Sequence, residues 1–275
     1  TGGIMRPVLH RIMQARVNAL GIPVRLGLTV DALGEDADGV DVRFSDGSDG
    51  RYDVVVGADG IASRVRALAF PDAVEPAETG QACWRLSTKR PEGFDRNEFF
   101  LGHQNAAGLN ACGPDTIYLW MLTRHEPGAW LSEAEAHGRL RRELADFGGT
   151  MAWVRDNMTD EDWINYRPLA AMIQPDPWTT GRIVLLGDAA HATTPHLASG
   201  AGMAVEDALV LGDELEVAGR PVADSLRAYS ARRYSRCRHV VETSVAVGKL
   251  QLEGGSAEQV GKLIGEGLHA LAAEY

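Results

Sequence analysis

The chain has 275 residues and a mass of 29.6 kDa, which is enough for one large domain or two small ones. With 45% hydrophobic and 24% charged residues, its composition is that of an ordinary globular protein and excludes a disordered or fibrous one. The 27 basic and 38 acidic residues give a net charge of −11, which argues against binding to nucleic acid or to an anionic membrane surface.

The first predicted element is a helix over residues 5–20. Its apolar residues repeat at helical spacing and lie on one face. Pro7 lies in the first turn, where a missing N–H costs little, and Gly21 and Pro23 end the helix.

Three strand-like runs follow, over residues 23–33, 40–44 and 51–57. Polar, glycine-containing turns separate them, so we predict an antiparallel meander. The third run contains three consecutive valines at 54–56, and we expect them to be buried on both faces of a sheet.

Residues 80–175 are expected to form a second domain, inserted into the first and containing a sheet of its own. All six tryptophans lie in or beside this region, which has strand-like runs over 81–88 and 116–123. Ser132 and Glu135 form a capping box that predicts the start of a helix.

The chain then returns to the first domain, which therefore comprises residues 1–79 and 176–275. Residues 182–186 are apolar except for the first and predict a buried strand. The rest is predicted to be helical, over residues 200–218, 222–249 and 256–273.

The cysteine pattern excludes a disulfide framework and a zinc ribbon. Cys83, Cys112 and Cys237 are widely spaced and form no CxxC pair. No signal sequence opens the chain, and no apolar run approaches the about 20 residues needed to span a bilayer. These features indicate a cytoplasmic protein without a membrane partner.

The strongest functional signal is the segment RIVLLGDAAHATTP at residues 182–195. A buried strand ends there in Gly187 and Asp188, a position at which α/β proteins bind ligands. Gly187 allows close approach of the backbone, and Asp188 offers an acceptor for a sugar or ribityl hydroxyl. The alternative, which the residues leave open, is that Asp188 only caps the following turn.

Gly200, Ala201 and Gly202 begin the helix that follows. A helix start of this kind presents unpaired N–H groups and the positive end of the dipole, which suits the negative charge of a reduced flavin ring. The glycine pair resembles the start of a GxGxxG motif, but Val205 replaces the third glycine and no strand immediately precedes it.

Two further signals are weak when taken alone. The segment DVVVGADG is another buried strand, here ending in Asp59 and Gly60. Arg6 lies at the start of the first helix, where a guanidinium can contact a phosphate through two hydrogen bonds. The alternatives are an ordinary strand and turn, and an ordinary surface arginine.

Taken together, these motifs resemble the flavin-dependent aromatic hydroxylases of the para-hydroxybenzoate and salicylate hydroxylase class, over almost the whole chain. The resemblance implies an α/β fold: a Rossmann-like FAD-binding domain, incomplete at its N-terminus, with an inserted α+β substrate domain and C-terminal helices. The family opens with a strand–GxGxxG–helix segment that has no counterpart here. A second difference is that the family's usual Gly-Gln-Gly is replaced by Gly200-Ala201-Gly202 in this chain.

The resemblance also implies which residues bind the cofactor. Arg6 would contact FAD, Asp59 would lie near the pyrophosphate and contribute to FAD and NAD(P)H binding, and Asp188 would bind the ribityl chain. Pro195 would line the isoalloxazine ring. The full implied set is Arg6, Asp59, Gly60, Gly187, Asp188, Pro195, Gly200, Ala201 and Gly202.

The implied reaction uses NADPH or NADH to reduce FAD, and O2 to form a flavin C4a-hydroperoxide that hydroxylates a small phenolic or pyridinol-type ring. The tryptophan-rich insertion would exclude water from the ring. A base that deprotonates the ring hydroxyl would help, and His196, next to Pro195, is the first candidate. Arg85, His103 and Tyr166 are weaker candidates for substrate contacts. For each of these residues the alternative is a structural role.

Several alternatives remain. The histidines at 191 and 196 lack the spacing of a metal site, so we expect no metal. A related FAD enzyme, such as an epoxidase or a halogenase, would share most of the motifs. An inactive or split fragment, acting as a binding module, would share them as well. The sequence leaves the oligomeric state open, a homodimer included.

Overall fold

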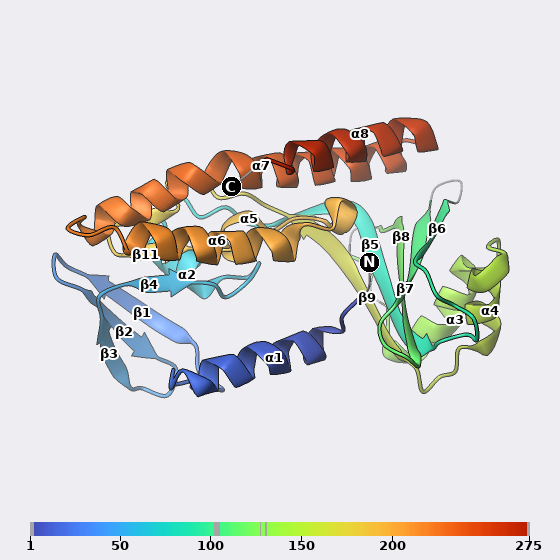
Figure 1. The fold of residues 1–275 in the computed structure, drawn as a ribbon, viewed down its shortest axis with the longest axis horizontal. Helices are drawn as coiled ribbons and strands as arrows, with labels where there is room; N and C mark the ends of the chain where they lie inside the picture. The colour runs from blue at the N-terminus through green and yellow to red at the C-terminus, as the bar shows by residue number, and fades with distance from the viewer. Residues whose placement is uncertain (1–2, 102–104, 127, 130, 274–275) are drawn as a thin grey trace. The chain divides into compact units, whose positions relative to one another are not determined.

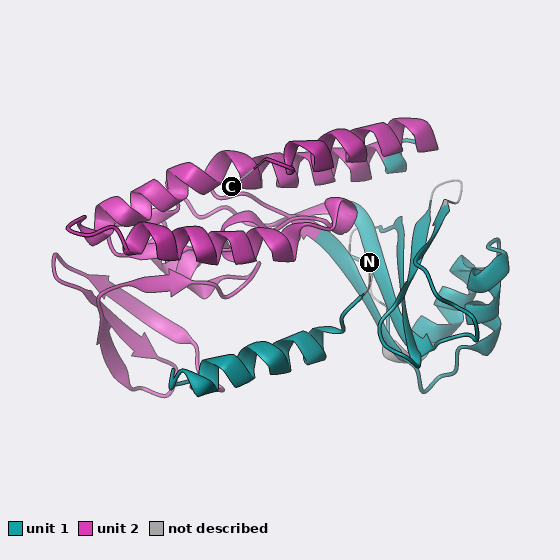
Figure 2. Cartoon of the chain, viewed as in Figure 1, with its two compact units in different colours: residues 1–24, 80–169, 251–254 teal, residues 25–79, 170–250, 255–275 magenta. Residues whose placement is uncertain are grey.

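The structure is a computed structural model with a mixed α/β fold, and it describes residues 3–101, 105–126, 128–129 and 131–273 (Figure 1). The chain divides into two compact units (Figure 2). Unit 1 comprises residues 1–24, 80–169 and 251–254, and unit 2 comprises residues 25–79, 170–250 and 255–275. Residues 1–24 thus group with the region expected to be the insertion, whereas the sequence assigned them to the FAD-binding domain.

Unit 1 is built on a five-stranded sheet with the order β6-β7-β8-β5-β9. Its strands are β5 (Ala77–Lys89), β6 (Glu98–Leu101), β7 (Ala106–Ala111), β8 (Thr116–Arg124) and β9 (Trp163–Ala171). The strands predicted at 81–88 and 116–123 are confirmed, and they pair with each other as antiparallel β5 and β8. The capping box of Ser132 and Glu135 is also confirmed, at the start of α3 (Glu133–Glu143).

Helices α3 and α4 (Gly149–Asn157) of unit 1 pack against one face of this sheet. The side chain of Trp84 lies on that face and packs in a core with residues of α3 and of α4, among them Leu140 and Met151. Adjacent residues of a strand point to opposite faces. Arg85 therefore lies on the other face, where it is paired across the strands with Trp120.

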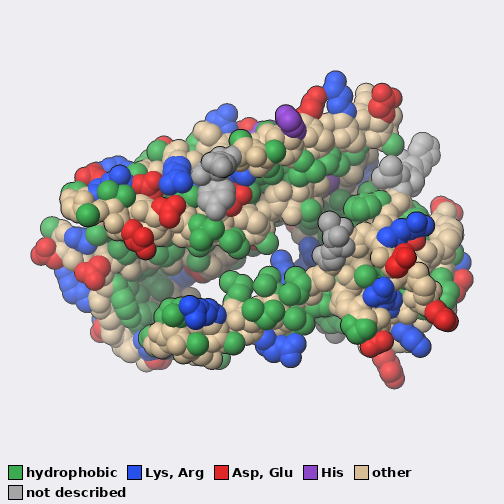
Figure 3. All heavy atoms as spheres, in the orientation of Figure 1, with side chains coloured by type: hydrophobic (Ala, Val, Ile, Leu, Met, Phe, Trp, Pro, Cys, Tyr) green, Lys and Arg blue, Asp and Glu red, His purple; other side chains and the backbone are tan. Residues whose placement is uncertain are grey.

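Helix α1 (Arg6–Ala19) confirms the predicted helix, and its apolar side chains lie at the surface. None of its residues is buried. The side chains of Ile12 and Met13 are 59% and 55% exposed, and hydrophobic side chains lie at the surface over this helix (Figure 3). Periodicity predicts the apolar face of a helix but not which part of the chain covers it.

Unit 2 contains a three-stranded antiparallel meander of β1 (Val30–Glu35), β2 (Val40–Phe44) and β3 (Asp49–Tyr52), as predicted. The predicted strand at 23–33 is wrong in its first half, because the backbone turns at Gly27, which has a φ of +74°. The predicted strand at 51–57 is two strands, since β3 ends at Tyr52 and β4 (Val55–Gly57) belongs to another sheet.

The second sheet of unit 2 has the order β10-β11-β4 and combines segments far apart in the sequence. In it, β4 pairs in parallel with β11 (Ile183–Leu185), and β10 (Thr179–Thr180) covers the other side of β11. All three residues of β11 are buried, as predicted. The expected burial of 54–56 is wrong, because β4 is the edge strand among the described residues and Val56 is 40% exposed.

The helices of unit 2 follow the two motifs that end β4 and β11. Three long helices agree with the predicted ones to within a few residues: α6 (Gly200–Leu215), α7 (Val222–Leu252) and α8 (Ala257–Ala270). Three short ones were not predicted: α2 (Arg64–Ala69), α5 (Asp188–His191) and the 3-10 turn η1 (Pro195–Leu197). Helices α6 and α7 lie side by side (Figure 1), joined by an ion pair between Asp207 and Arg233.

No helix in the described part of the chain combines the length and the hydropathy of a membrane-spanning segment.

Candidate functional site

The parallel pairing of β4 and β11 brings the two aspartate motifs to one edge of the sheet. Leu185 lies opposite Gly57, and the next N–H, that of Leu186, donates to the carbonyl of Gly57 at 3.0 Å. Asp59 and Asp188 therefore follow the carboxyl ends of neighbouring parallel strands. This edge is where open α/β sheets bind their ligands.

The turn after β11 depends on Gly187, which has a φ of +61° and a ψ of −140°. A Cβ atom at this position would also lie 3.1 Å from the Cβ of Ala204, so helix α6 packs directly on the turn. Only glycine meets both conditions without strain. The N–H groups of Ala190 and His191 donate to the Gly187 carbonyl at 2.8 and 2.9 Å and shape the short helix α5.

Asp188 is held at this turn by the backbone alone. Its side chain is exposed, and within the described residues its carboxylate has no hydrogen bond or ion pair. The alternative in which Asp188 caps the turn is therefore not what the structure shows. Both oxygens are available to accept hydrogen bonds from a ligand.

Unlike Asp188, Asp59 makes several hydrogen bonds within the protein. Its carboxylate accepts the backbone N–H groups of Arg64 at 2.7 Å and Val65 at 3.1 Å, as well as the hydroxyl of Ser63. These contacts satisfy the first N–H groups of α2, which have no partner within the helix. Asp59 thus fixes the loop that contains Gly60, and its contact with FAD or NAD(P)H stays a prediction.

Arg66 joins the two motifs, and the sequence analysis did not find it. Its side chain is 3% exposed, and its guanidinium donates to the carbonyl of Ala189 at 2.9 Å and to that of Ile61 at 2.8 Å. Burial lowers the pKa of Arg66, although a guanidinium remains charged in proteins. In the sequence Arg66 looks like the exposed Arg64 two residues earlier, so no local signal marks it.

The start of α6 adds backbone donors beside the same turn. Ala201 and Gly202 are exposed in the first turn of this 16-residue helix, whose first N–H groups have no acceptor within the helix. A Cβ atom at Gly200 would lie 3.0 Å from a methyl of Thr193, so the helix begins against the segment that follows α5. Such a helix start favours negative charge in a ligand.

Pro195 and His196 lie between these elements, in the 3-10 turn. Pro195 is exposed and His196 is half-buried. The Nδ1 atom of His196 is 2.9 Å from the hydroxyl of Thr194. The structure therefore brings these two candidates into the same unit as Gly187, Asp188 and Gly200–Gly202, and their roles stay predictions.

The candidate substrate contacts lie in unit 1 and are not brought together. Tyr166 packs on Trp84, with ring centroids 4.4 Å apart, and its hydroxyl is 2.8 Å from Nδ1 of His125. Burial raises its pKa. Because Trp84 and Arg85 are adjacent in β5, Tyr166 and Arg85 lie on opposite faces of the sheet.

The remaining two candidates can be placed only in part. Arg6 is exposed in the first turn of α1 and belongs to unit 1. His103 lies outside the described residues.

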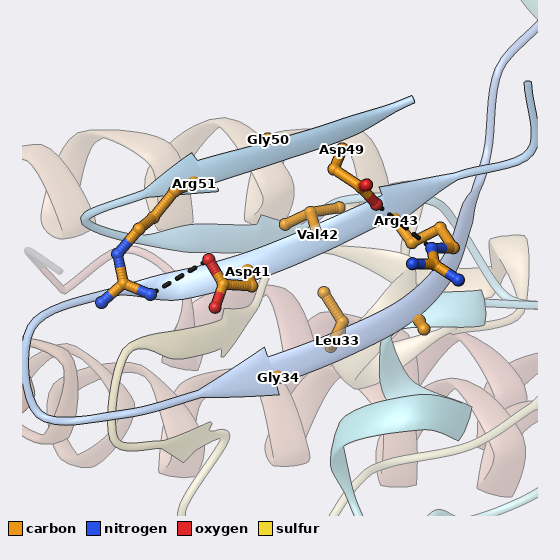
Figure 4. Close-up of a pocket in the computed structure, with 9 residues that line it drawn as sticks. Leu33, Gly34, Asp41, Val42, Arg43, Asp49, Gly50 and Arg51 are labelled. Carbon is orange, nitrogen blue, oxygen red and sulfur yellow. Dashed lines mark hydrogen bonds and ion pairs between the residues drawn. The ribbon is translucent and has the colours of Figure 1, made fainter. Parts of the chain in front are cut away.

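A hollow of about 640 Å³ lies on the β1-β2-β3 sheet and has none of the predicted site residues in its lining (Figure 4). Its charges are paired across the strands, with Arg43 at 3.1 Å from Asp49 and Arg51 at 3.0 Å from Asp41. The two carboxylates of its lining are thus engaged with guanidinium groups of the same lining.

Three buried residues of unit 2 have the chemistry of metal ligands. His191, Asp207 and Cys237 each place a ligand atom within 4.8 Å of the others. The Nε of Arg233, however, donates to Oδ1 of Asp207 at 2.7 Å. A cation at this point would be repelled by the guanidinium, so we interpret the cluster as a hydrogen-bonded network.

Parallel strands that end at a shared edge are the usual place for a nucleotide cofactor in α/β proteins, and comparisons with known proteins identify the cofactor. The family described as "FAD binding domain" matches residues 3–244. The chain belongs to this family of flavin-dependent monooxygenases, which includes aromatic hydroxylases, as the motifs predicted.

Individual relatives show how far the similarity extends. YetM of Bacillus subtilis (strain 168) is 30% identical over 264 residues, which cover 94% of this chain and 71% of that protein. The 2-heptyl-3-hydroxy-4(1H)-quinolone synthase of Pseudomonas aeruginosa is 32% identical over 234 residues, 82% of this chain and 59% of that enzyme. The structure of Klebsiella pneumoniae HpxO complexed with FAD and uric acid superimposes with a TM-score of 0.81 at 25% identity, covering 93% of this chain and 66% of that one.

Proposed function

We propose that this chain acts in an FAD-dependent monooxygenase that hydroxylates a small aromatic molecule of phenolic or pyridinol type, with NADPH or NADH as co-substrate and O2 as oxidant. The observation that carries the proposal is the shared edge of β4 and β11, where the Gly187–Asp188 turn and the start of α6 meet. The relatives support the substrate class, since one makes a hydroxyquinolone and another was crystallised with uric acid.

The residues present fit FAD. Asp188 has free carboxylate oxygens that can accept hydrogen bonds from ribityl hydroxyls, and the N–H groups of Ala201 and Gly202 can face the electron-rich edge of the ring. When bound, FAD supplies the redox and oxygen chemistry. The chain orients it, and a half-buried base such as His196 can hold the proton of a ring hydroxyl.

We further propose that residues 1–79 and 176–275 contribute a Rossmann-like FAD-binding domain and that residues 80–175 form the inserted substrate domain. Arg85 is the substrate contact that we favour, because it lies half-buried on the sheet face opposite the core that contains α3 and α4, whereas Tyr166 packs against that core. An arginine beside Trp120 suits a ring that bears an anionic group.

The test begins with FAD titration of the purified protein and of Asp188→Ala. Loss of a hydrogen bond to a charged group should weaken FAD binding about ten- to a hundredfold. The matched control is Asp53→Ala, because Asp53 is another exposed aspartate of unit 2 and its substitution should leave the affinity unchanged. Incubation with NADPH or NADH, labelled O2 and a panel of phenols should then give a hydroxylated product containing the label. A protein that binds no FAD, or that forms no labelled product, overturns the proposal and favours a non-catalytic role.

A further inference from the structure

Asp207 is a fully buried charged residue beside the candidate site, with no exposed surface. Its Oδ2 accepts the backbone N–H of Gly187 at 3.0 Å and lies 2.6 Å from Nε2 of His191. Its Oδ1 accepts Nε of Arg233 at 2.7 Å and lies 3.7 Å from Sγ of Cys237. One carboxylate of α6 therefore holds the turn after β11 and helix α7 together.

The carboxylate is ionised within this network. Burial by itself raises the pKa of Asp207, but the hydrogen bonds of His191, Arg233 and the Gly187 N–H outweigh it and hold the pKa below its usual value. His191 is fixed in turn by the ring of Trp178, with centroids 5.2 Å apart. Asp207 is thus a fixed anion with a set direction for each of its oxygens.

Stabilisation of the fold alone does not explain why a buried carboxylate occupies this position. Well-packed apolar residues often replace a buried ion pair without loss of stability. An apolar side chain, however, cannot accept a hydrogen bond from the Gly187 N–H, which belongs to the Leu186–Gly187 peptide, one residue before Asp188. The turn is also packed against α6 at Ala204, one helical turn before Asp207. Both contacts fix the turn to the helix whose first residues are Gly200–Gly202.

We propose that Asp207 is a positioning residue for the flavin: it orients Asp188 by holding the Gly187 N–H, so that the Asp188 carboxylate and the N–H groups at the start of α6 meet the cofactor in a fixed arrangement. The inference rests on the proposed function, because it acts through the contact of Asp188 with FAD. Asp207 would thus contribute to the affinity for FAD without contacting FAD itself.

The test is a double-mutant cycle in FAD affinity, measured by titration of the full protein. Asp207→Asn keeps the size of the side chain but loses the charge and places a donor against one of its present donors. We expect FAD binding about tenfold weaker in Asp207→Asn. In the Asp188→Ala background, the same substitution should change the affinity less than about twofold.

Ser230→Ala is the control for a purely structural role. Ser230 is buried in α7, where its hydroxyl accepts a hydrogen bond from the backbone N–H of Trp178 at 2.8 Å and donates one to the carboxylate of Asp176 at 2.6 Å. Its loss should lower the free energy of unfolding and leave FAD affinity unchanged. If Asp207→Asn does not fold, Asp207→Glu keeps the charge, displaces the oxygens, and enters the same cycle.

The outcomes separate the two proposals. If Asp188→Ala leaves FAD affinity unchanged, the role of Asp188 fails and with it the inference. If Asp188→Ala weakens binding but both Asp207 variants bind FAD normally, only the inference is overturned. It is also overturned if the Asp207 variants weaken binding equally in both backgrounds, because Asp207 would then act by another route.

Discussion

Replacement of Arg66 by methionine tests whether the two aspartate motifs depend on one buried guanidinium. Arg66 donates to the carbonyls of Ile61 and Ala189, and so joins the loop after β4 to the turn after β11. Methionine retains most of the apolar stem and removes both donors. The perturbation is therefore confined to the contact between the two loops.

The expected loss can be worked from these contacts. Hydrogen bonds to a charged group contribute about 1.5–3 kcal/mol each, and both acceptors lose their partner. The loss of stability is partly offset, because methionine does not carry the desolvation cost of a buried guanidinium. We therefore expect Arg66→Met to lower the free energy of unfolding by about 3 kcal/mol. FAD binding should weaken as well, since the Ala189 carbonyl lies in the turn that presents Asp188.

Arg64→Met is the matched control, because Arg64 lies in the same helix but its side chain is 53% exposed. Its guanidinium donates a hydrogen bond of 3.2 Å to the carbonyl of Val30 and lies 3.8 Å from the carboxylate of Asp31. Exposed contacts of this kind contribute below about 1 kcal/mol. Urea unfolding and FAD titration of both variants provide the comparison. Equal losses in the two variants, or an Arg66→Met protein as stable as the wild type, would refute the reasoning.

Three further predictions concern single groups. Ser132→Ala should lower the free energy of unfolding by about 1 kcal/mol through loss of the capping box of α3, as measured in urea. The hydrogen bond from Arg51 lowers the pKa of Asp36 to about 2. The ionised Asp36 therefore stabilises the folded state fully above pH 3.8, and this stabilisation is lost as the pH falls toward 2. In Arg51→Met, carboxyl NMR titration should show the pKa of Asp36 rise toward 3.8. Burial raises the pKa of all three cysteines, but Cys112 alone is not fully buried, so a thiol reagent at neutral pH should label it first and the other two only after unfolding. An unmoved Asp36 pKa, or equal labelling of the three thiols, would contradict these two predictions.

The parts of the fold that the sequence predicted are those set by neighbouring residues. The three long helices, the meander and the capping box at Ser132 follow from local periodicity and turn residues. The division of residues 51–57 between two sheets was missed, because it depends on the pairing of Val55 with Ile183. The exposure of α1 does not follow from a local pattern either, because the spacing of apolar residues does not say what covers their face.

The candidate site shows the same limit at the level of single side chains. Asp59 and Asp188 each follow an apolar strand-like run and a glycine, and the family resemblance implied cofactor contacts for both. The chain after Asp59 turns back and offers it the N–H groups of Arg64 and Val65, whereas the backbone after Asp188 bonds to the Gly187 carbonyl. Whether a carboxylate stays available is therefore decided by the path of the chain after the motif.

The carboxylates of Asp59, Asp188 and Asp207 at the candidate site differ in their hydrogen-bond partners, and their expected roles follow from this difference. The carboxylates of Asp59 and Asp207 accept hydrogen bonds from backbone and side-chain donors, so each holds a loop in place. Asp188 lies between the segments that they fix and keeps its oxygens free. A ligand-binding carboxylate gains specificity only if its position is set without using its own acceptors, because each acceptor used internally is lost to the ligand. Substitution of Asp59 or Asp207 should therefore affect stability and geometry together, whereas substitution of Asp188 should affect binding alone.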